Sequence, residues 1–160
     1  MKFFEDIQVG DVFEVGRYTF TADNIKAFAN PFDPQPFHVD EEAAARSHFG
    51  ALVASGWHTA LAWMRLMIDH RRRMDEAMLA RGEPVAGIGP ALGFRELKWL
   101  KPVYVGDIIE YKSEVTELRL SNSRPRFGLM TFRSTGVNQN GEPVLSLIST
   151  TFVERRGKAS

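Results

Sequence analysis

The chain has 160 residues, and its apolar fraction of 44% and charged fraction of 25% are typical of one soluble globular domain. Basic and acidic residues number 20 each, so no net charge attracts nucleic acid or an anionic membrane. Cysteine is absent, which excludes disulfides, thiolate metal sites and a cysteine nucleophile. The sequence shows no signal-peptide core and no apolar run of membrane-spanning length, so we expect a single cytoplasmic domain over residues 1–160.

The first fifty residues predict one strand and two short helices. Residues 12–20 follow a Gly-Asp turn and are rich in β-branched and aromatic side chains, which indicates a strand. Thr21 is a suitable helix N-cap, and the apolar spacing after it predicts a short helix that ends at Asn30-Pro31. Three acidic residues at 40–42 then open a second short helix, where carboxylates stabilise the positive end of the helix dipole.

One long helix is predicted in the middle of the chain, from about Ser55 to Arg81. Apolar residues recur along it at helical spacing, in a stripe of Trp57, Leu61, Met64 and Ile68 and an adjoining stripe of Ala60, Trp63 and Met67. A helix that is apolar over so much of its circumference is expected to lie in the core, wrapped by a sheet.

The second half of the chain predicts an antiparallel sheet. Strand-like segments occupy residues 92–100, 108–118, 127–137 and 143–153. Asn140-Gly141 lies between the last two segments and is a strong hairpin signal. The final segment is apolar on both faces, so we expect a helix to cover one face and a partner subunit to cover the other. The order of elements predicts an α+β fold, with an antiparallel sheet curled around one long helix.

The segment between the two short helices carries the clearest chemical signal. Residues 30–38 contain three prolines, which fix φ and remove backbone donors, and this predicts a stiff loop. Asp33 and His38 lie five positions apart on it, and a carboxylate and an imidazole that share one water can move protons near neutral pH. A surface turn with a solvated Asp and a hydrogen-bonded His would show the same pattern, so both interpretations stay open at this point.

One motif is Asp33-Pro34-Gln35-Pro36-Phe37-His38, and a second is Ser55-Gly56 at the entrance to the long helix. Together they resemble the MaoC-like dehydratases, a family that includes the (R)-specific enoyl-CoA hydratases. Residues 93–107 resemble the second strand of that family and the turn after it. Gln35 stands where the hydratase pattern has Asn, and Ser55 stands where the hydratases commonly have His.

This resemblance implies the hotdog fold over the whole chain, a homodimer or an assembly of dimers, and hydro-lyase chemistry. The implied reaction is reversible addition of water to a trans-2-enoyl thioester of coenzyme A or a related carrier, with no cofactor. Asp33 and His38 would be the catalytic pair. Gln35, Ser55 and Gly56 would bind substrate, with the Gly56 N–H as a donor to the thioester oxygen as negative charge develops there.

Two other functions remain for a hotdog chain. An acyl-CoA thioesterase of this fold usually carries a carboxylate on or beside the long helix, and residues 55–67 contain none. A non-catalytic acyl-CoA-binding protein would have lost its acid–base pair, whereas Asp33 and His38 are both present. The replacement of Asn by Gln35 keeps this third function open.

Several other residues have a structural explanation beside a chemical one. Ser55 is a better N-cap than nucleophile, and His58 suits a core or pocket-lining position. No metal site is expected, because the acidic residues 40–42 near His38 are explained by the start of a helix. The arginines at 71–73 could meet the phosphates of coenzyme A, or they could form a solvated face of the long helix.

Overall fold

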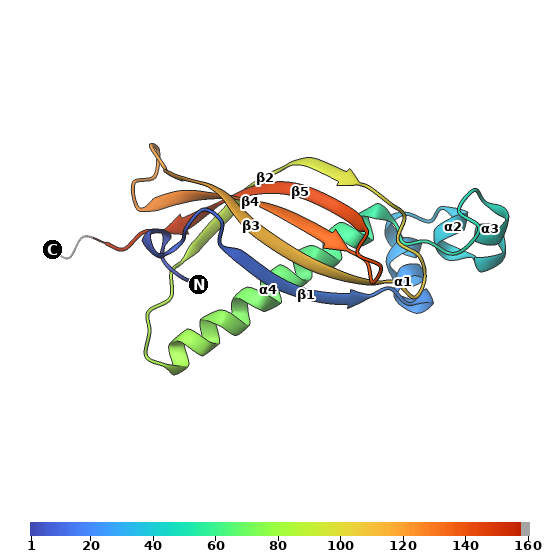
Figure 1. Ribbon diagram of the computed structural model, residues 1–160, viewed down its shortest axis with the longest axis horizontal. Helices are drawn as coiled ribbons and strands as arrows, with labels where there is room; N and C mark the ends of the chain where they lie inside the picture. Colours follow the sequence, from blue (N-terminus) through green and yellow to red (C-terminus); the bar gives the residue numbers. More distant parts are fainter. Residues whose placement is uncertain (158–160) are drawn as a thin grey trace.

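The computed structural model describes residues 1–157, with a five-stranded antiparallel sheet curved over one long helix (Figure 1). Its helical elements are η1 (Phe4–Asp6), α1 (Ala22–Phe32), α2 (Pro36–Val39), α3 (Glu41–Arg46) and α4 (Gly56–Ala80). Its strands are β1 (Val12–Thr19), β2 (Ile88–Trp99), β3 (Ile108–Leu120), β4 (Phe127–Val137) and β5 (Pro143–Glu154). The predicted α+β hotdog architecture is therefore confirmed.

The strand order in the sheet is β1-β3-β4-β5-β2, so β1 and β2 are the two edges. The predicted hairpin joins β4 to β5, and the N–H of Gly141 donates to the carbonyl oxygen of Asn138 at 3.0 Å. The three short helices α1, α2 and α3 gather at one end of the sheet, where α4 also begins (Figure 1). None of the helices in residues 1–157 combines the length and apolar content that crossing a membrane would require.

The proline-rich segment is more helical than its sequence predicts. α1 starts with a capping box between Thr21 and Asn24, and it continues through Pro31 to Phe32 instead of ending before it. Pro36 occupies the first position of α2, where its missing N–H has no intrahelical partner in any case. The expectation of an irregular loop over residues 30–38 is therefore only partly right, because His38 lies on a helical turn.

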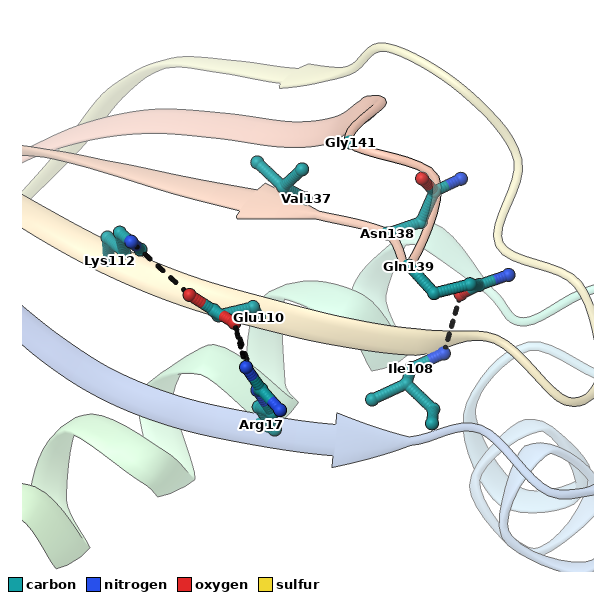
Figure 2. A pocket seen from close by; sticks show the side chains of 8 residues that line it. All are labelled: Arg17, Ile108, Glu110, Lys112, Val137, Asn138, Gln139 and Gly141. Carbon is teal, nitrogen blue, oxygen red and sulfur yellow. Dashed lines mark hydrogen bonds and ion pairs between the residues drawn. The ribbon is translucent and has the colours of Figure 1, made fainter.

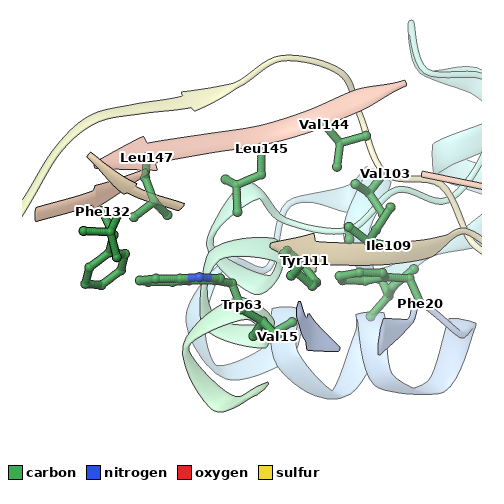
Figure 3. Close-up of a cluster of buried hydrophobic side chains, with 14 of the residues drawn as sticks. Val15, Phe20, Trp63, Val103, Ile109, Tyr111, Phe132, Val144, Leu145 and Leu147 are labelled. Carbon is green, nitrogen blue, oxygen red and sulfur yellow. The ribbon is translucent and has the colours of Figure 1, made fainter. Parts of the chain in front are cut away.

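The core lies between α4 and the sheet (Figure 3). Trp63 of α4 lies among side chains from β3, β4 and β5, among them Tyr111, Phe132 and Leu147, as Figure 3 shows. The hydroxyl of Tyr111 donates to the carbonyl oxygen of Thr59 at 3.0 Å. This bond links the first turns of α4 to the sheet, at the end where the short helices lie.

The predicted burial of α4 was right for Trp63 of the second stripe and wrong for the first stripe. The side chains that α4 buries are His58, Thr59, Ala62 and Trp63. The expected core stripe is instead exposed along its whole length: Trp57 48%, Leu61 51%, Met64 38% and Ile68 57%. The helix has two apolar stripes, and the curved sheet of one chain covers only one of them.

The expected role of a partner subunit at the final strand was also wrong. β5 is an interior strand between β4 and β2. Its apolar side chains on both faces are already buried by the chain itself: Val144, Leu145, Leu147, Ile148, Phe152 and Val153. β5 therefore leaves no apolar face for a partner subunit to cover.

Candidate active site

Asp33 and His38 are brought together by the turn between α1 and α2. Asp33 caps the C-terminus of α1, where its N–H donates to the carbonyl oxygen of Ala29 at 2.8 Å. His38 follows one turn later on α2, and its Nε2 lies 3.4 Å from Oδ2 of Asp33. The imidazole is 5% exposed, so the pair faces a restricted space rather than open solvent. Of the two interpretations of this segment, the geometry favours a cooperating pair.

Asp33 is held by the two polar side chains that the sequence marks as substrate-binding. The hydroxyl of Ser55 donates to Oδ2 at 2.6 Å, and the amide Nε2 of Gln35 donates to Oδ1 at 2.8 Å. Burial opposes the charge of this carboxyl group, but the hydrogen bonds from Ser55 and Gln35 outweigh it and lower the pKa of Asp33, and His38 adds to this effect when its ring is protonated. The carboxylate form is therefore favoured at neutral pH.

The tautomer of neutral His38 follows from its second contact. Nδ1 lies 2.7 Å from the carbonyl oxygen of Val53, which can only accept a hydrogen bond. Nδ1 must therefore carry a proton, and Nε2 presents a lone pair toward Asp33. Two proton acceptors then face the same position, where a single water could donate one hydrogen to each.

The first turn of α4 forms the wall beside this pair. Ser55 is the N-cap, as expected, and accepts a hydrogen bond from the N–H of Trp57 at 3.3 Å. Gly56 is the first residue of the helix, a position whose N–H has no partner within a helix. The helix start therefore places a backbone donor next to the residue that holds Asp33.

Trp99 of β2 packs on Gly56, a contact that the sequence did not predict. A Cβ atom added to Gly56 would lie 2.5 Å from the indole ring of Trp99, so no larger residue fits without movement. Trp99 also meets Trp57 edge to face, with ring centroids 5.3 Å apart. Both indoles are about half exposed, so together they form an aromatic rim at the start of α4. The strand pattern gave no signal that this residue would reach the helix.

His58 lies in an aromatic cluster, which confirms the expected buried position. Its ring stacks on Phe28 of α1 with centroids 4.7 Å apart, and it meets Tyr18 of β1 and Phe20, which follows that strand, edge to face. Nε2 lies 3.3 Å from the hydroxyl of Tyr18. Burial lowers the pKa of His58 to about 4, so the ring is neutral at physiological pH. The cluster joins α1, β1 and α4 directly beneath the candidate site.

The arginines of α4 favour the solvated-face interpretation. Arg71 pairs with Asp75 at 3.5 Å and Arg72 pairs with Asp69 at 3.2 Å, both within the helix. Ion pairs of this kind between neighbouring turns are typical of an exposed helix face. Among residues 1–157, no group of three or more His, Asp or Glu side chains is arranged to hold a metal ion.

A separate hollow of about 620 Å³ lies beside β1, β3 and the turn between β4 and β5 (Figure 2). Glu110 occupies its wall and pairs with Arg17 at 2.7 Å and with Lys112 at 3.3 Å. None of its lining residues belongs to the Asp33–His38 site. Its charges satisfy one another, so we assign it no chemistry.

Comparison with known proteins agrees with the fold. The MaoC-like domain matches residues 6–135. A 3-hydroxybutyryl-CoA dehydratase of Methylorubrum extorquens is 30% identical over 146 residues, covering 91% of this chain and 83% of that protein. The crystal structure of a MaoC-like dehydratase from Rhodospirillum rubrum is 42% identical with a TM-score of 0.80, and the match covers 98% of this chain and 99% of that one. The (R)-hydratase of A. caviae, 23% identical with a TM-score of 0.64 over 95% of this chain and 99% of its own, has the same fold. This chain belongs to the MaoC-like domain family.

Proposed function

We propose that this protein is a hydro-lyase that adds water reversibly to a trans-2-enoyl thioester. The observation that carries the proposal is the approach of Asp33 Oδ2 to His38 Nε2 at 3.4 Å, beside the first turn of α4. The dehydratase from Methylorubrum extorquens supports the reaction type, because its name describes the removal of water from a 3-hydroxyacyl-CoA. The (R)-hydratase of A. caviae contributes the fold alone.

In this mechanism the pair holds the attacking water and moves its protons. The water oxygen bonds to the β-carbon of the enoyl group while Asp33 and His38 take one proton from it. The pair then returns one proton to the α-carbon, so that the net change is addition of one water across the double bond. The reverse sequence removes water from a 3-hydroxyacyl thioester. Addition of water involves no net oxidation or reduction, so this mechanism needs no redox cofactor.

The backbone at the start of α4 would stabilise the charge that develops on the thioester oxygen. The N–H of Gly56 lies at the positive end of the helix dipole, where an oxyanion is stabilised. Ser55 and Gln35 act on Asp33, which they keep charged and oriented. Their part in binding the substrate would therefore be indirect.

We further propose that the working form is a homodimer joined along β2. This edge strand has one neighbour in the chain, β5, and its other side is free of strand partners among the described residues. Leu92 and Phe94 on it are 58% and 55% exposed, which is unusual for adjacent large apolar side chains on a strand. A second copy would cover them.

The test is hydration of a panel of trans-2-enoyl-CoA thioesters by the purified protein, followed through the loss of absorbance of the conjugated thioester. Hydration of at least one thioester, lost in Asp33→Asn, is the expected result. Release of free thiol without hydration would identify a thioesterase instead. Tight binding of thioesters with neither reaction would identify an acyl-binding protein.

A further inference from the structure

A cavity of about 370 Å³ opens between α4 and the sheet, beyond the first two turns of the helix. All six methionines of the chain line it: Met1, Met64, Met67, Met74, Met78 and Met130. Methionine side chains are flexible and polarisable, so they adapt to an apolar ligand of variable shape. We call this cavity the methionine groove.

The floor of the methionine groove is buried and mostly apolar. Met130 and Phe132 of β4 line it and are 3% and 5% exposed. The two hydroxyls on the floor are already used, because Ser149 donates to the carbonyl oxygen of Gly93 and Thr151 to that of Gly89. A depth of this kind admits a slender apolar chain more readily than the surface of a second folded protein.

Three cationic side chains line the rim, those of Lys2, Arg71 and Arg81. Arg81 is held by Glu83 through two hydrogen bonds of 2.7 and 3.0 Å, and Arg71 pairs with Asp75. These exposed pairs are weak, but the charges stand at the rim, whereas the interior is lined by apolar side chains. The interior of the groove therefore suits the neutral part of a ligand whose polar part lies elsewhere.

The exposed stripe of α4 leads from the candidate active site to this groove. It begins at Trp57, next to Gly56, and its last two members, Met64 and Ile68, line the groove. At 1.5 Å per residue, Met64 lies about 12 Å along the helix from Gly56, and Met78 about 33 Å. A four-carbon acyl group ends well before Met64, whereas a long acyl chain extends into the groove.

We propose that the methionine groove receives the distal part of a long, apolar acyl chain, so that the protein acts preferentially on long-chain thioesters. This inference rests on the proposed function and specifies the substrate of the same site. The thioester and its reacting double bond lie at the start of α4, and the tail lies along the stripe and in the groove.

The test compares two variants on one helix. Met64 lines the groove and Leu79 does not, and the two side chains are 38% and 59% exposed, so lysine is tolerated at both. In the wild type, kcat/KM should be higher for trans-2-hexadecenoyl-CoA than for crotonyl-CoA. Met64→Lys should lower the hexadecenoyl value about tenfold, because a charge now borders the apolar chain, and leave the crotonyl value unchanged. Leu79→Lys should change neither value.

Three results would overturn the inference: equal rates for both chain lengths in the wild type, an equal loss for both in Met64→Lys, or the same loss in Leu79→Lys. A shift of Met64→Lys from dimer to monomer with unchanged chain-length preference would show that a second copy covers the groove instead. Calorimetric titration with hexadecanoyl-CoA and butanoyl-CoA, neither of which can be hydrated, separates this inference from the proposed function. If no enoyl thioester is hydrated, tighter binding of the longer ligand, lost only in Met64→Lys, still supports the groove, and equal binding refutes it.

Discussion

The hydroxyl of Ser55 donates a hydrogen bond of 2.6 Å to Oδ2 of Asp33, and the oxygen of this hydroxyl accepts a hydrogen bond from the N–H of Trp57. The residue that starts the long helix therefore also fixes the carboxylate of the candidate catalytic pair. A hydroxyl can both donate and accept, which is why serine serves both purposes at this position. Helix formation and site geometry depend on the same side chain.

Replacing Ser55 by alanine should affect both properties. The hydrogen bond from Ser55 helps to lower the pKa of Asp33, so its loss should raise that pKa. Activity that needs the carboxylate is present above this pKa and lost below it. The acidic limb of the pH profile of kcat/KM should therefore move to higher pH, and the missing cap should lower the free energy of unfolding by about 1 kcal/mol.

Ser55→Thr is the control, because it keeps a hydroxyl at the same place and should retain the original acidic limb. If Ser55→Ala has an unchanged acidic limb, the hydrogen bond to Asp33 does not tune the reaction.

Removal of either member of the acid–base pair should slow hydration strongly. Asp33→Asn keeps the shape but loses the charge, and His38→Ala loses the imidazole; each should reduce kcat by roughly a hundredfold or more. The double variant should lose much less than the product of the two single effects, because the residues act as a unit. Asp23→Asn, which changes an exposed carboxylate on the same helix, should have wild-type kinetics. Full activity in Asp33→Asn would contradict the proposed mechanism.

The contact between Gly56 and Trp99 predicts a specific pair of variants. In Gly56→Ala the new methyl overlaps the indole of Trp99, which should cost about 1–3 kcal/mol of stability. That loss should exceed the gain of about 1 kcal/mol from replacing glycine within a helix. Gly56→Ala/Trp99→Leu should recover most of the stability in urea unfolding, since the overlap is gone. A Gly56→Ala variant as stable as the wild type would show that Trp99 moves aside freely.

Most of the fold could be predicted from the sequence because local signals agree with one another. Thr21, Asn140-Gly141 and the helical spacing after Ser55 each specify a cap, a turn or a helix through interactions within a few residues. The Asp33–His38 pair was also accessible, since both residues lie on one short segment that a known family motif covers.

What could not be predicted depends on contacts distant in the sequence. Periodicity shows that α4 has two apolar stripes, but not that the sheet buries Trp63 and leaves Leu61 exposed. The contact of Trp99 with Gly56 joins residues 43 positions apart and arises from the curvature of the sheet. Pro31 was expected to end α1, but a proline in the last turn of a helix is tolerated when the tertiary structure favours the extra turn.

The exposed apolar side chains of β2 predict how the protein assembles. Light scattering at micromolar concentration should give the mass of a dimer or a multiple of it. Phe94→Lys should shift the mass toward the monomer, because a charge at the centre of this edge resists burial. Leu120→Lys, an equally exposed apolar position on β3, should leave the assembly unchanged. A wild type that is only monomeric would refute the proposed homodimer.

Buried, neutral His58 predicts a loss of stability in mild acid. Its pKa in the folded protein is about 4, lowered by burial from the ordinary value of 6.5 that the unfolded chain should show. Between these two values the unfolded state binds a proton that the folded state does not, so the free energy of unfolding falls as the pH falls from about 6.5 toward 4. The part due to His58 should be roughly 1–2 kcal/mol between pH 7 and pH 5.

Urea unfolding at both pH values, for the wild type and for His58→Phe, measures this loss of stability. The variant keeps an aromatic ring against Phe28 but cannot take up a proton, so its stability should change less over the same interval. Identical losses in both proteins would mean that other groups cause the acid sensitivity and that His58 is not held neutral by its aromatic cluster.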